Sequence, residues 1–106
     1  MSVILKEAWT IRKKFPQRIP VIVYPSNKTI QQIDKQKFLV PKDLMFGQFV
    51  YIVRKRLNLA NTEALFLFTD NNTIPPTSEL FSSIDHKYRS LQGYVIIHYS
   101  FENTFG

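Results

Sequence analysis

Apolar residues recur along the chain with two different spacings, and these spacings predict three helices and four strands. Apolar positions three and four residues apart predict helices over residues 3–15, 45–57 and 80–88. Short apolar runs predict strands over residues 18–24, 37–41, 65–68 and 94–99.

Local signals mark where several of these elements begin and end. Ser2 is the expected N-cap of the first helix, and Pro16 ends it because proline disfavours helical geometry in the preceding residue. Thr77 and Ser78 follow a rigid Pro-Pro bend and are the expected N-caps of the third helix. Residues 100–106 carry no periodicity and are expected to form a mobile tail.

Strands and helices do not alternate strictly, and this order indicates the fold class. It favours an α+β domain in which helices cover one face of a mixed sheet. With 106 residues, the chain holds about one domain. We therefore expect an N-terminal helix over residues 1–16, a folded core over residues 17–99 and a tail over residues 100–106.

Charge is distributed unevenly between the two halves of the chain. Residues 1–56 contain 12 basic and 3 acidic side chains, whereas residues 57–106 contain 2 basic and 5 acidic ones. The basic half is expected to meet an acidic partner, which leaves nucleic acid, an anionic membrane and an acidic peptide open. Nucleic acid is not favoured, because the aromatic residues mostly fall on apolar core faces and no RNA-binding or helix-turn-helix pattern is present.

The sequence offers little chemistry for an enzyme. Because cysteine is absent, disulfide scaffolds, cysteine-ligated zinc and thiol catalysis are excluded. His86 and His98 lack neighbours at metal-ligand spacing, and a structural or surface role is expected for His98. Asp43, Asp70 and Asp85 are interpreted as cap or turn residues. We therefore expect no catalytic residue, no metal and no cofactor.

The sequence also predicts a cytoplasmic location. Lys6 and Glu7 come before any apolar segment of signal-peptide length has formed. No window approaches the roughly 18 consecutive apolar residues of a membrane span.

Two features point to a protein partner. The strand over residues 37–41 is bounded by Lys37 and Pro41, residue types that natural sheets place on exposed edges, where another chain can dock. The sequence ends on Gly106, whose carboxylate has no Cβ beside it and can enter a narrow active site. There it could be adenylated, passed to a cysteine thioester and attacked by an amine.

Several segments form a specific pattern. They are Ile11-Arg12-Lys13-Lys14-Phe15-Pro16, Arg18-Ile19-Pro20-Val21-Ile22-Val23, Asp34-Lys35-Gln36-Lys37-Phe38-Leu39-Val40-Pro41, Gly47-Gln48-Phe49, Arg54-Lys55-Arg56, Ile74-Pro75-Pro76-Thr77 and Glu102-Asn103-Thr104-Phe105-Gly106. From about Lys6 to Gly106, the sequence resembles the autophagy ubiquitin-like modifiers, the family of GABARAP and the microtubule-associated protein light chains.

The resemblance implies a ubiquitin-like β-grasp fold with an N-terminal helical extension that is shorter than in most relatives. It implies that activating and conjugating enzymes join Gly106 to phosphatidylethanolamine on autophagic membranes, and that a deconjugating cysteine protease acts on the product. The implied location is cytoplasmic, and the autophagosomal membrane after lipidation. Cargo receptors and adaptors are implied to bind through acidic peptides with an aromatic-x-x-aliphatic core.

The same resemblance implies where such a peptide binds. It would add to the strand edge at residues 37–40, with alternate side chains entering two pockets. The aromatic pocket would be lined by Glu7, Ile11, Pro20, Ile22, Lys37, Leu39 and Tyr94. The aliphatic pocket would use Phe38, Val40, Pro41, Leu44, Phe49 and Ile52. The acidic flank would meet Arg18, Lys35, Lys37 and Arg56. On sequence alone, core packing is preferred for Phe49 and Ile52.

Two alternatives remain open. One is a ubiquitin-like modifier conjugated to a protein lysine, a branch usually marked by Trp before the terminal Gly; Phe105 argues against it. The other is a basic module that binds RNA or an anionic membrane and is never conjugated.

Overall fold

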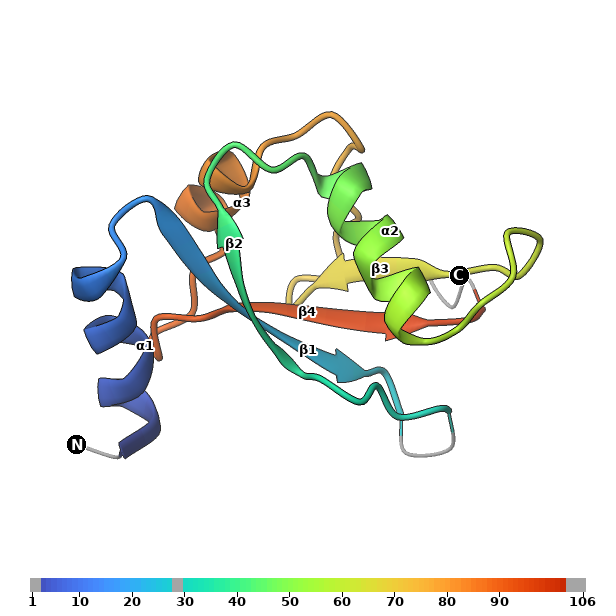
Figure 1. Ribbon diagram of the computed structural model, residues 1–106, viewed down its shortest axis with the longest axis horizontal. Helices are drawn as coiled ribbons and strands as arrows, with labels where there is room; N and C mark the ends of the chain where they lie inside the picture. Colours follow the sequence, from blue (N-terminus) through green and yellow to red (C-terminus); the bar gives the residue numbers. More distant parts are fainter. Residues whose placement is uncertain (1–2, 28–29, 103–106) are drawn as a thin grey trace.

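The computed structural model describes residues 3–27 and 30–102, and Figure 1 shows their arrangement. The elements are α1 (Val3–Lys14), β1 (Arg18–Pro25), β2 (Lys37–Pro41), α2 (Phe46–Arg56), β3 (Phe66–Thr69), α3 (Phe81–Tyr88) and β4 (Val95–Ser100). Every element predicted from the apolar pattern is therefore confirmed, with no end more than one residue from the position that this pattern predicts. The N-terminal helix expected over residues 1–16 ends earlier, at Lys14. Ser2, the expected N-cap of α1, lies outside the described residues.

The strands of the described chain form one mixed sheet in the order β2-β1-β4-β3. β1 pairs antiparallel with β2 and parallel with β4, and β3 pairs antiparallel with β4. Pro20 lies just before the first β1–β4 pair, Val21 with Val95, so its missing N–H costs the sheet no hydrogen bond. The predicted mixed sheet is confirmed, and β2 lies at one of its margins.

β1 is apolar on both sides, and helices cover both of its faces (Figure 1). Val21 and Val23 belong to the main core, which also contains buried side chains of α2 and α3. Ile22 lies on the other face, where it packs with Ala8 of α1 and with Tyr94. Because a strand that is apolar on both sides needs cover on both faces, α1 lies opposite α2 and α3. The expectation that helices cover one face therefore holds for α2 and α3 but not for α1.

β4 runs one residue further than predicted, and this shortens the expected tail. Ser100 pairs with Phe66 of β3 and is only 3% exposed. Phe101 packs against the main core, with its ring centre 6.2 Å from that of Tyr99. The predicted boundary at residue 100 is therefore wrong, because the folded core continues through Phe101.

The first turns of α2 and α3 are capped by each other's flanking segments. Met45 and Leu80, which immediately precede the two helices, form an antiparallel bridge. The N–H of Phe46 donates to the Glu79 carbonyl (2.8 Å). In the opposite direction, the N–H of Phe81 donates to the Leu44 carbonyl (2.9 Å). Main-chain bonds therefore satisfy donors that side-chain caps would otherwise have to satisfy.

Thr77 and Ser78 are not the N-caps of α3, contrary to the prediction. The N-cap is Leu80, which makes no side-chain capping bond. The segment before it acts through its main chain instead, because the Thr77 carbonyl accepts from the Gly47 N–H of α2 at 2.9 Å.

A cluster of charges joins α1 to α3. The Asp85 carboxylate is buried and accepts from Arg12 of α1 at 2.6 and 3.0 Å and from Arg89 at 2.8 and 3.2 Å. Arg12 Nε also donates to the Gly93 carbonyl at 2.7 Å. Both guanidinium groups lie within 5.7 Å of the Trp9 ring centre. Asp85 is thus an ion-pair partner between two helices, and its interpretation as a cap or turn residue is wrong.

Candidate functional site

β2 presents main-chain groups at the margin of the sheet. Two hydrogen bonds just beyond its ends fix the pairing with β1, from Val23 N–H to the Gln36 carbonyl (2.8 Å) and from Lys42 N–H to the Gln17 carbonyl (3.2 Å). Because hydrogen-bonded and non-hydrogen-bonded pairs alternate in antiparallel ladders, the main-chain groups of Lys37 and Leu39 point away from β1. A further strand could pair with these groups.

A pocket of about 330 Å³ lies beside this edge, between β2 and α1. This β2–α1 pocket is lined by Glu7, Ile11, Phe15, Pro20, Lys35, Lys37, Phe38, Leu39 and Tyr94. Of the predicted aromatic set, the fold brings all but Ile22 to the pocket wall. Ile22 is 8% exposed and packs beneath, against Ala8 and Tyr94.

Phe15 is a lining residue that the sequence reasoning missed. Its spacing assigned it to the apolar face of the first helix, yet its side chain is 43% exposed. Pro16 is the signal that could have found it, because proline ends the helix before Phe15. Phe15 therefore lies beyond the helix face that packs on the sheet.

Lys37 and Glu7, which both line the β2–α1 pocket, form an ion pair. Lys37 Nζ donates to both carboxylate oxygens, at 2.9 and 3.1 Å. The hydrogen bond from Lys37 lowers the pKa of Glu7, and the hydrogen bond to Glu7 raises the pKa of Lys37. Both residues therefore carry full charge at neutral pH and hold each other in place.

The other predicted cations each have an internal contact. Arg18 donates to the outward-facing Leu39 carbonyl at 3.3 Å, and Lys35 Nζ lies 5.1 Å from the Phe38 ring centre. Arg56 lies 3.5 Å from the Asp34 carboxylate. All three side chains are exposed, so these contacts are weak and can be exchanged for contacts with a partner.

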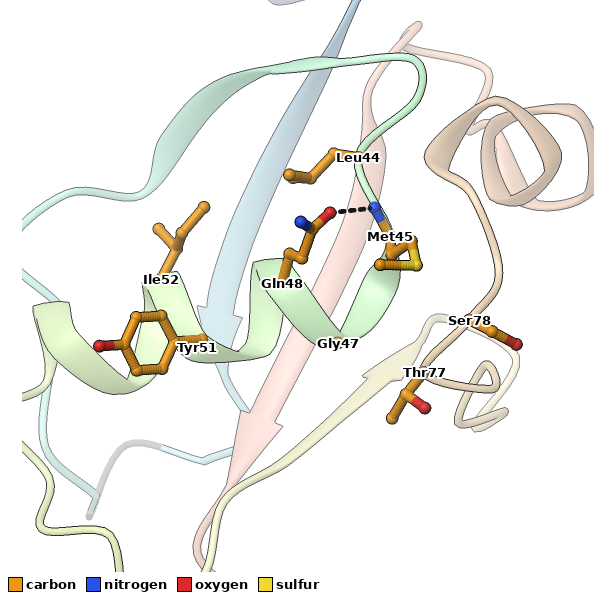
Figure 2. Close-up of a pocket in the computed structure, with 8 residues that line it drawn as sticks. All are labelled: Leu44, Met45, Gly47, Gln48, Tyr51, Ile52, Thr77 and Ser78. Atoms are coloured by element: carbon orange, nitrogen blue, oxygen red, sulfur yellow. Dashed lines mark hydrogen bonds between the residues drawn. The ribbon is translucent and has the colours of Figure 1, made fainter.

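A second, larger pocket of about 650 Å³ lies along α2, and Figure 2 shows its lining. This α2 pocket is lined by Leu44, Met45, Gly47, Gln48, Tyr51, Ile52, Thr77 and Ser78. Figure 2 also shows the Gln48 side chain accepting a hydrogen bond from the Met45 N–H at 2.9 Å, which fixes the start of α2. The lining is mainly apolar, and Met45, Tyr51 and Ile52 are exposed.

The predicted aliphatic set is divided between core and surface. Leu44 and Ile52 line the α2 pocket, so the preference for Ile52 as a core residue is wrong. Val40 and Phe49 are buried in the main core, as preferred for Phe49. Phe38 lines the β2–α1 pocket and lies edge-on to Phe49, with ring centres 5.4 Å apart. The lining of the α2 pocket also contains residues that sequence reasoning missed, namely Met45, Gly47, Gln48, Tyr51, Thr77 and Ser78.

Pro41 joins neither of these two pockets. It lines a more polar depression of about 400 Å³ together with Gln17, Arg18, Lys42 and Asp43.

Tyr94 forms a buried part of the β2–α1 pocket wall. It is 2% exposed, and its hydroxyl makes no hydrogen bond with any described residue. Burial, and then the Glu7 carboxylate, raises the pKa of Tyr94, whereas Lys37 acts in the opposite direction. The hydroxyl therefore lies close to the Glu7 carboxylate, and each group shifts the pKa of the other.

The described residues offer neither a metal centre nor a membrane helix. Within them, no group of three or more His, Cys, Asp or Glu side chains could hold a metal ion. No helix in the same part of the chain is long and apolar enough to cross a membrane. His98 Nε2 lies 2.6 Å from the Asp70 carboxylate at the end of β3, which agrees with a structural or surface role. Gly106, the predicted conjugation residue, lies outside the described residues.

Comparison with known proteins identifies the family. Residues 4–106 match the family described as autophagy protein Atg8, ubiquitin like. Autophagy-related protein 8e of Arabidopsis thaliana is 52% identical over 101 residues, which cover 94% of this chain and 82% of that protein. Autophagy-related protein 8 of Schizosaccharomyces pombe is 50% identical over 101 residues, with coverage of 94% and 83%.

Solved structures confirm the predicted ubiquitin-like fold. Trypanosoma brucei ATG8 is 39% identical with a TM-score of 0.83, covering 97% of this chain and 89% of that one. Plasmodium falciparum Atg8, solved in complex with a Plasmodium falciparum Atg3 peptide, is 31% identical with a TM-score of 0.85, with coverage of 94% and 89%. The chain therefore belongs to the autophagy protein Atg8 family and is an autophagy ubiquitin-like modifier.

Proposed function

We propose that this modifier is conjugated through Gly106 to the amine of phosphatidylethanolamine on autophagic membranes. Family membership over residues 4–106 supports the proposal, as does the resemblance of the segment 102–106 to the tail of the family. In this proposal the chain is not an enzyme. Its reactive group is a carboxylate, and the activating, conjugating and deconjugating proteins supply the catalysis. The chain is cytoplasmic until lipidation places it on the autophagosomal membrane.

The second part of the proposal is that receptors and adaptors bind at the edge of β2. The observation that carries it is the run of outward-facing main-chain groups at Lys37 and Leu39, directly beside the β2–α1 pocket. In β-strand addition, main-chain bonds provide affinity and pockets for alternate side chains provide specificity. The Atg3 peptide bound to Plasmodium falciparum Atg8 suggests that a peptide of this kind is also a partner here.

The positions of the two pockets suggest how the peptide lies. Its aromatic residue would enter the β2–α1 pocket, and its aliphatic residue would contact Leu44 and Ile52 in the α2 pocket. Because Lys37 begins β2 and Leu44 follows its end, an aromatic-x-x-aliphatic peptide would run parallel to β2. Acidic residues that flank the peptide core would replace the weak internal partners of Arg18, Lys35 and Arg56. Such charge pairs raise the association rate and the specificity more than the affinity.

Combining Lys37→Glu with Leu39→Ala is expected to weaken binding of an acidic aromatic-x-x-aliphatic peptide. The first change places a carboxylate beside Glu7 and repels the acidic flank, and the second removes part of the pocket wall. We expect a loss of about 2 kcal/mol, roughly 30-fold in Kd, measured by isothermal titration calorimetry.

Lys87→Glu is the matched control for the charge change. Lys87 is also an exposed lysine paired with a glutamate, at 3.0 Å from Glu79, but it lines neither pocket. The Lys87→Glu variant should therefore bind the peptide with the affinity of the wild type. An affinity that is unaltered in the β2 double variant would place the peptide site elsewhere.

Mass spectrometry of the C-terminus isolated from cells tests the conjugation itself. A mass increase equal to phosphatidylethanolamine minus water on Gly106 would support the proposal. An isopeptide bond to a protein lysine would instead indicate the protein-conjugated branch. A carboxylate that stays free while autophagy is induced would favour an unconjugated binding module.

A further inference from the structure

A row of three rings crosses the sheet on the face that carries α1. Tyr24 of β1 pairs with His98 of β4, and His98 pairs with Phe68 of β3. The ring centre of His98 lies 6.2 Å from that of Tyr24, and the same ring stacks on Phe68 at 5.6 Å. We term these three residues the aromatic row. Ala8 of α1 packs instead on Ile22, which lies two residues before Tyr24 in β1.

Phe68 is more deeply buried than its place in the sheet explains. β3 forms a margin of the sheet, and the described chain places no strand beyond it. At the other end of the row Tyr24 is 37% exposed, whereas Phe68 is only 6% exposed. The stacked His98 ring covers one side of the Phe68 ring and cannot by itself account for this burial. A further group must therefore cover Phe68 on this face.

The chain turns onto the same face as it leaves the sheet. β4 runs away from α1 toward the opposite end of the molecule (Figure 1). Ser100 follows His98 by two residues in this strand, so both side chains lie on one face. The Ser100 hydroxyl donates to the Glu102 carbonyl at 2.9 Å and accepts from the Glu102 N–H at 3.2 Å. These bonds hold the main chain of Glu102 on the face that carries the aromatic row.

Phe105 has the reach and the side chain to be the group that covers Phe68. An extended chain advances about 3.3–3.6 Å per residue, so the Cα atom of Phe105 can lie up to about 10 Å from that of Glu102. The aromatic row lies two strand residues, or about 7 Å, before Ser100. Outside residues 3–27 and 30–102, Phe105 is the one aromatic residue in the sequence.

We propose that the unconjugated protein docks its own C-terminal tail on this face, with the Phe105 ring against Phe68 and His98. The inference rests on the proposed conjugation through Gly106 and adds a means of regulating it. Because Gly106 directly follows the docked ring, its carboxylate stays beside the sheet while Phe105 is held. An activating enzyme must draw the tail off the aromatic row before the carboxylate can enter its active site. Docking therefore lowers the fraction of the protein that is ready for conjugation.

Nuclear magnetic resonance of the purified chain tests the docking itself. Phe105→Ala should shift the amide signals of Phe68 and His98, because it removes the ring that packs on them. Asn103→Ala is the matched control, since it changes the same tail but removes no ring, and it should leave both signals in place. Shifts in Phe105→Ala that stay within residues 102–106 would overturn the inference.

Release of Gly106 by a carboxypeptidase tests the consequence of docking. His98→Ala removes one ring from the dock and leaves the tail sequence unchanged, so the protease meets the same substrate. The rate of release should rise by about fivefold, the change in docked population expected for one ring contact. His86→Ala replaces the other histidine, which is exposed on α3, and should keep the wild-type rate. Equal rates in the wild type and His98→Ala would contradict docking on the aromatic row.

Both measurements use the unconjugated chain without lipid, peptide or enzymes of the cascade. Their outcome is therefore independent of the conjugation that mass spectrometry of the C-terminus tests.

Discussion

Deleting Gly106 is expected to abolish the lipidated form of this protein completely. The deletion leaves Phe105 as the terminal residue, whose bulky side chain lies next to the carboxylate that must be activated. Each covalent step uses that carboxylate: adenylation releases pyrophosphate, transfer to a cysteine releases AMP, and attack by the lipid amine releases the thiol. Loss of access at the first step stops all three. The measurement is the mobility-shifted band on urea gels after reaction with the partner cascade.

Asn103→Ala is the control for this deletion, because it keeps the chain length and the terminal glycine. It should give the wild-type band. Peptide binding should also survive deletion of Gly106, since every residue that lines the β2–α1 pocket is Tyr94 or precedes it. A shifted band of normal intensity in the deletion variant would exclude Gly106 as the conjugated residue.

Asp85→Asn is expected to lower the free energy of unfolding by about 3 kcal/mol, because it leaves two guanidinium groups without their counter-ion. The Asp85 side chain is 7% exposed and that of Arg12 is 14% exposed, so water compensates little for the lost charge. The damage should extend to peptide binding, because Glu7 and Ile11 line the β2–α1 pocket from α1, the helix that this cluster holds.

The loss of unfolding free energy in Asp85→Asn should decrease as the pH falls. Burial raises the pKa of Asp85, but the hydrogen bonds from Arg89 and Arg12 outweigh it and hold the pKa below its usual range. The folded state therefore releases this proton more readily than the unfolded state does. The stabilisation is fully present above the ordinary carboxyl pKa of about 4 and is lost as pH falls through the lower folded value.

Urea denaturation between pH 7 and pH 3 measures this dependence. The difference between wild type and Asp85→Asn should be largest at neutral pH and should shrink below about pH 4. Glu79→Gln is the control, because its partner Lys87 is half exposed, and an ion pair that water reaches contributes little to stability. A difference that stays constant across the range would mean that the carboxylate charge is not what stabilises the cluster.

The helices could be predicted from the periodic spacing of their apolar residues, and the strands could be predicted from their short apolar runs. From the residues alone, only the edge position of β2 could be predicted; the lining of the β2–α1 pocket was implied by the resemblance to the family. The division of the predicted aliphatic set between core and pocket could not be predicted from the sequence. Whether Phe49 lines a pocket or fills the core depends on rings from β2 and α3 that pack against it, Phe38 and Phe81, and no local pattern contains that information.

The role of Asp85 was hidden for a related reason. Its partner Arg89 lies one helical turn away and is visible in the sequence, but Arg12 lies 73 positions earlier. A carboxylate in a short helix looks like a surface group until the fold brings α1 against it. The misassigned caps of α3 have a similar origin, because a main-chain bridge to Met45 leaves no trace in residue type.

The bridge between Met45 and Leu80 makes the starts of α2 and α3 a single unit of local unfolding. Neither helix can release its first turn without removing the acceptors of the other, because Phe46 and Phe81 donate across the bridge in opposite directions. Their amide hydrogens should therefore exchange with solvent at matched rates, as members of one cooperative opening. The α2 pocket takes Met45 and Thr77 from this unit, so an occupant of that pocket would slow hydrogen exchange in α3, a helix that contributes no residue to its lining.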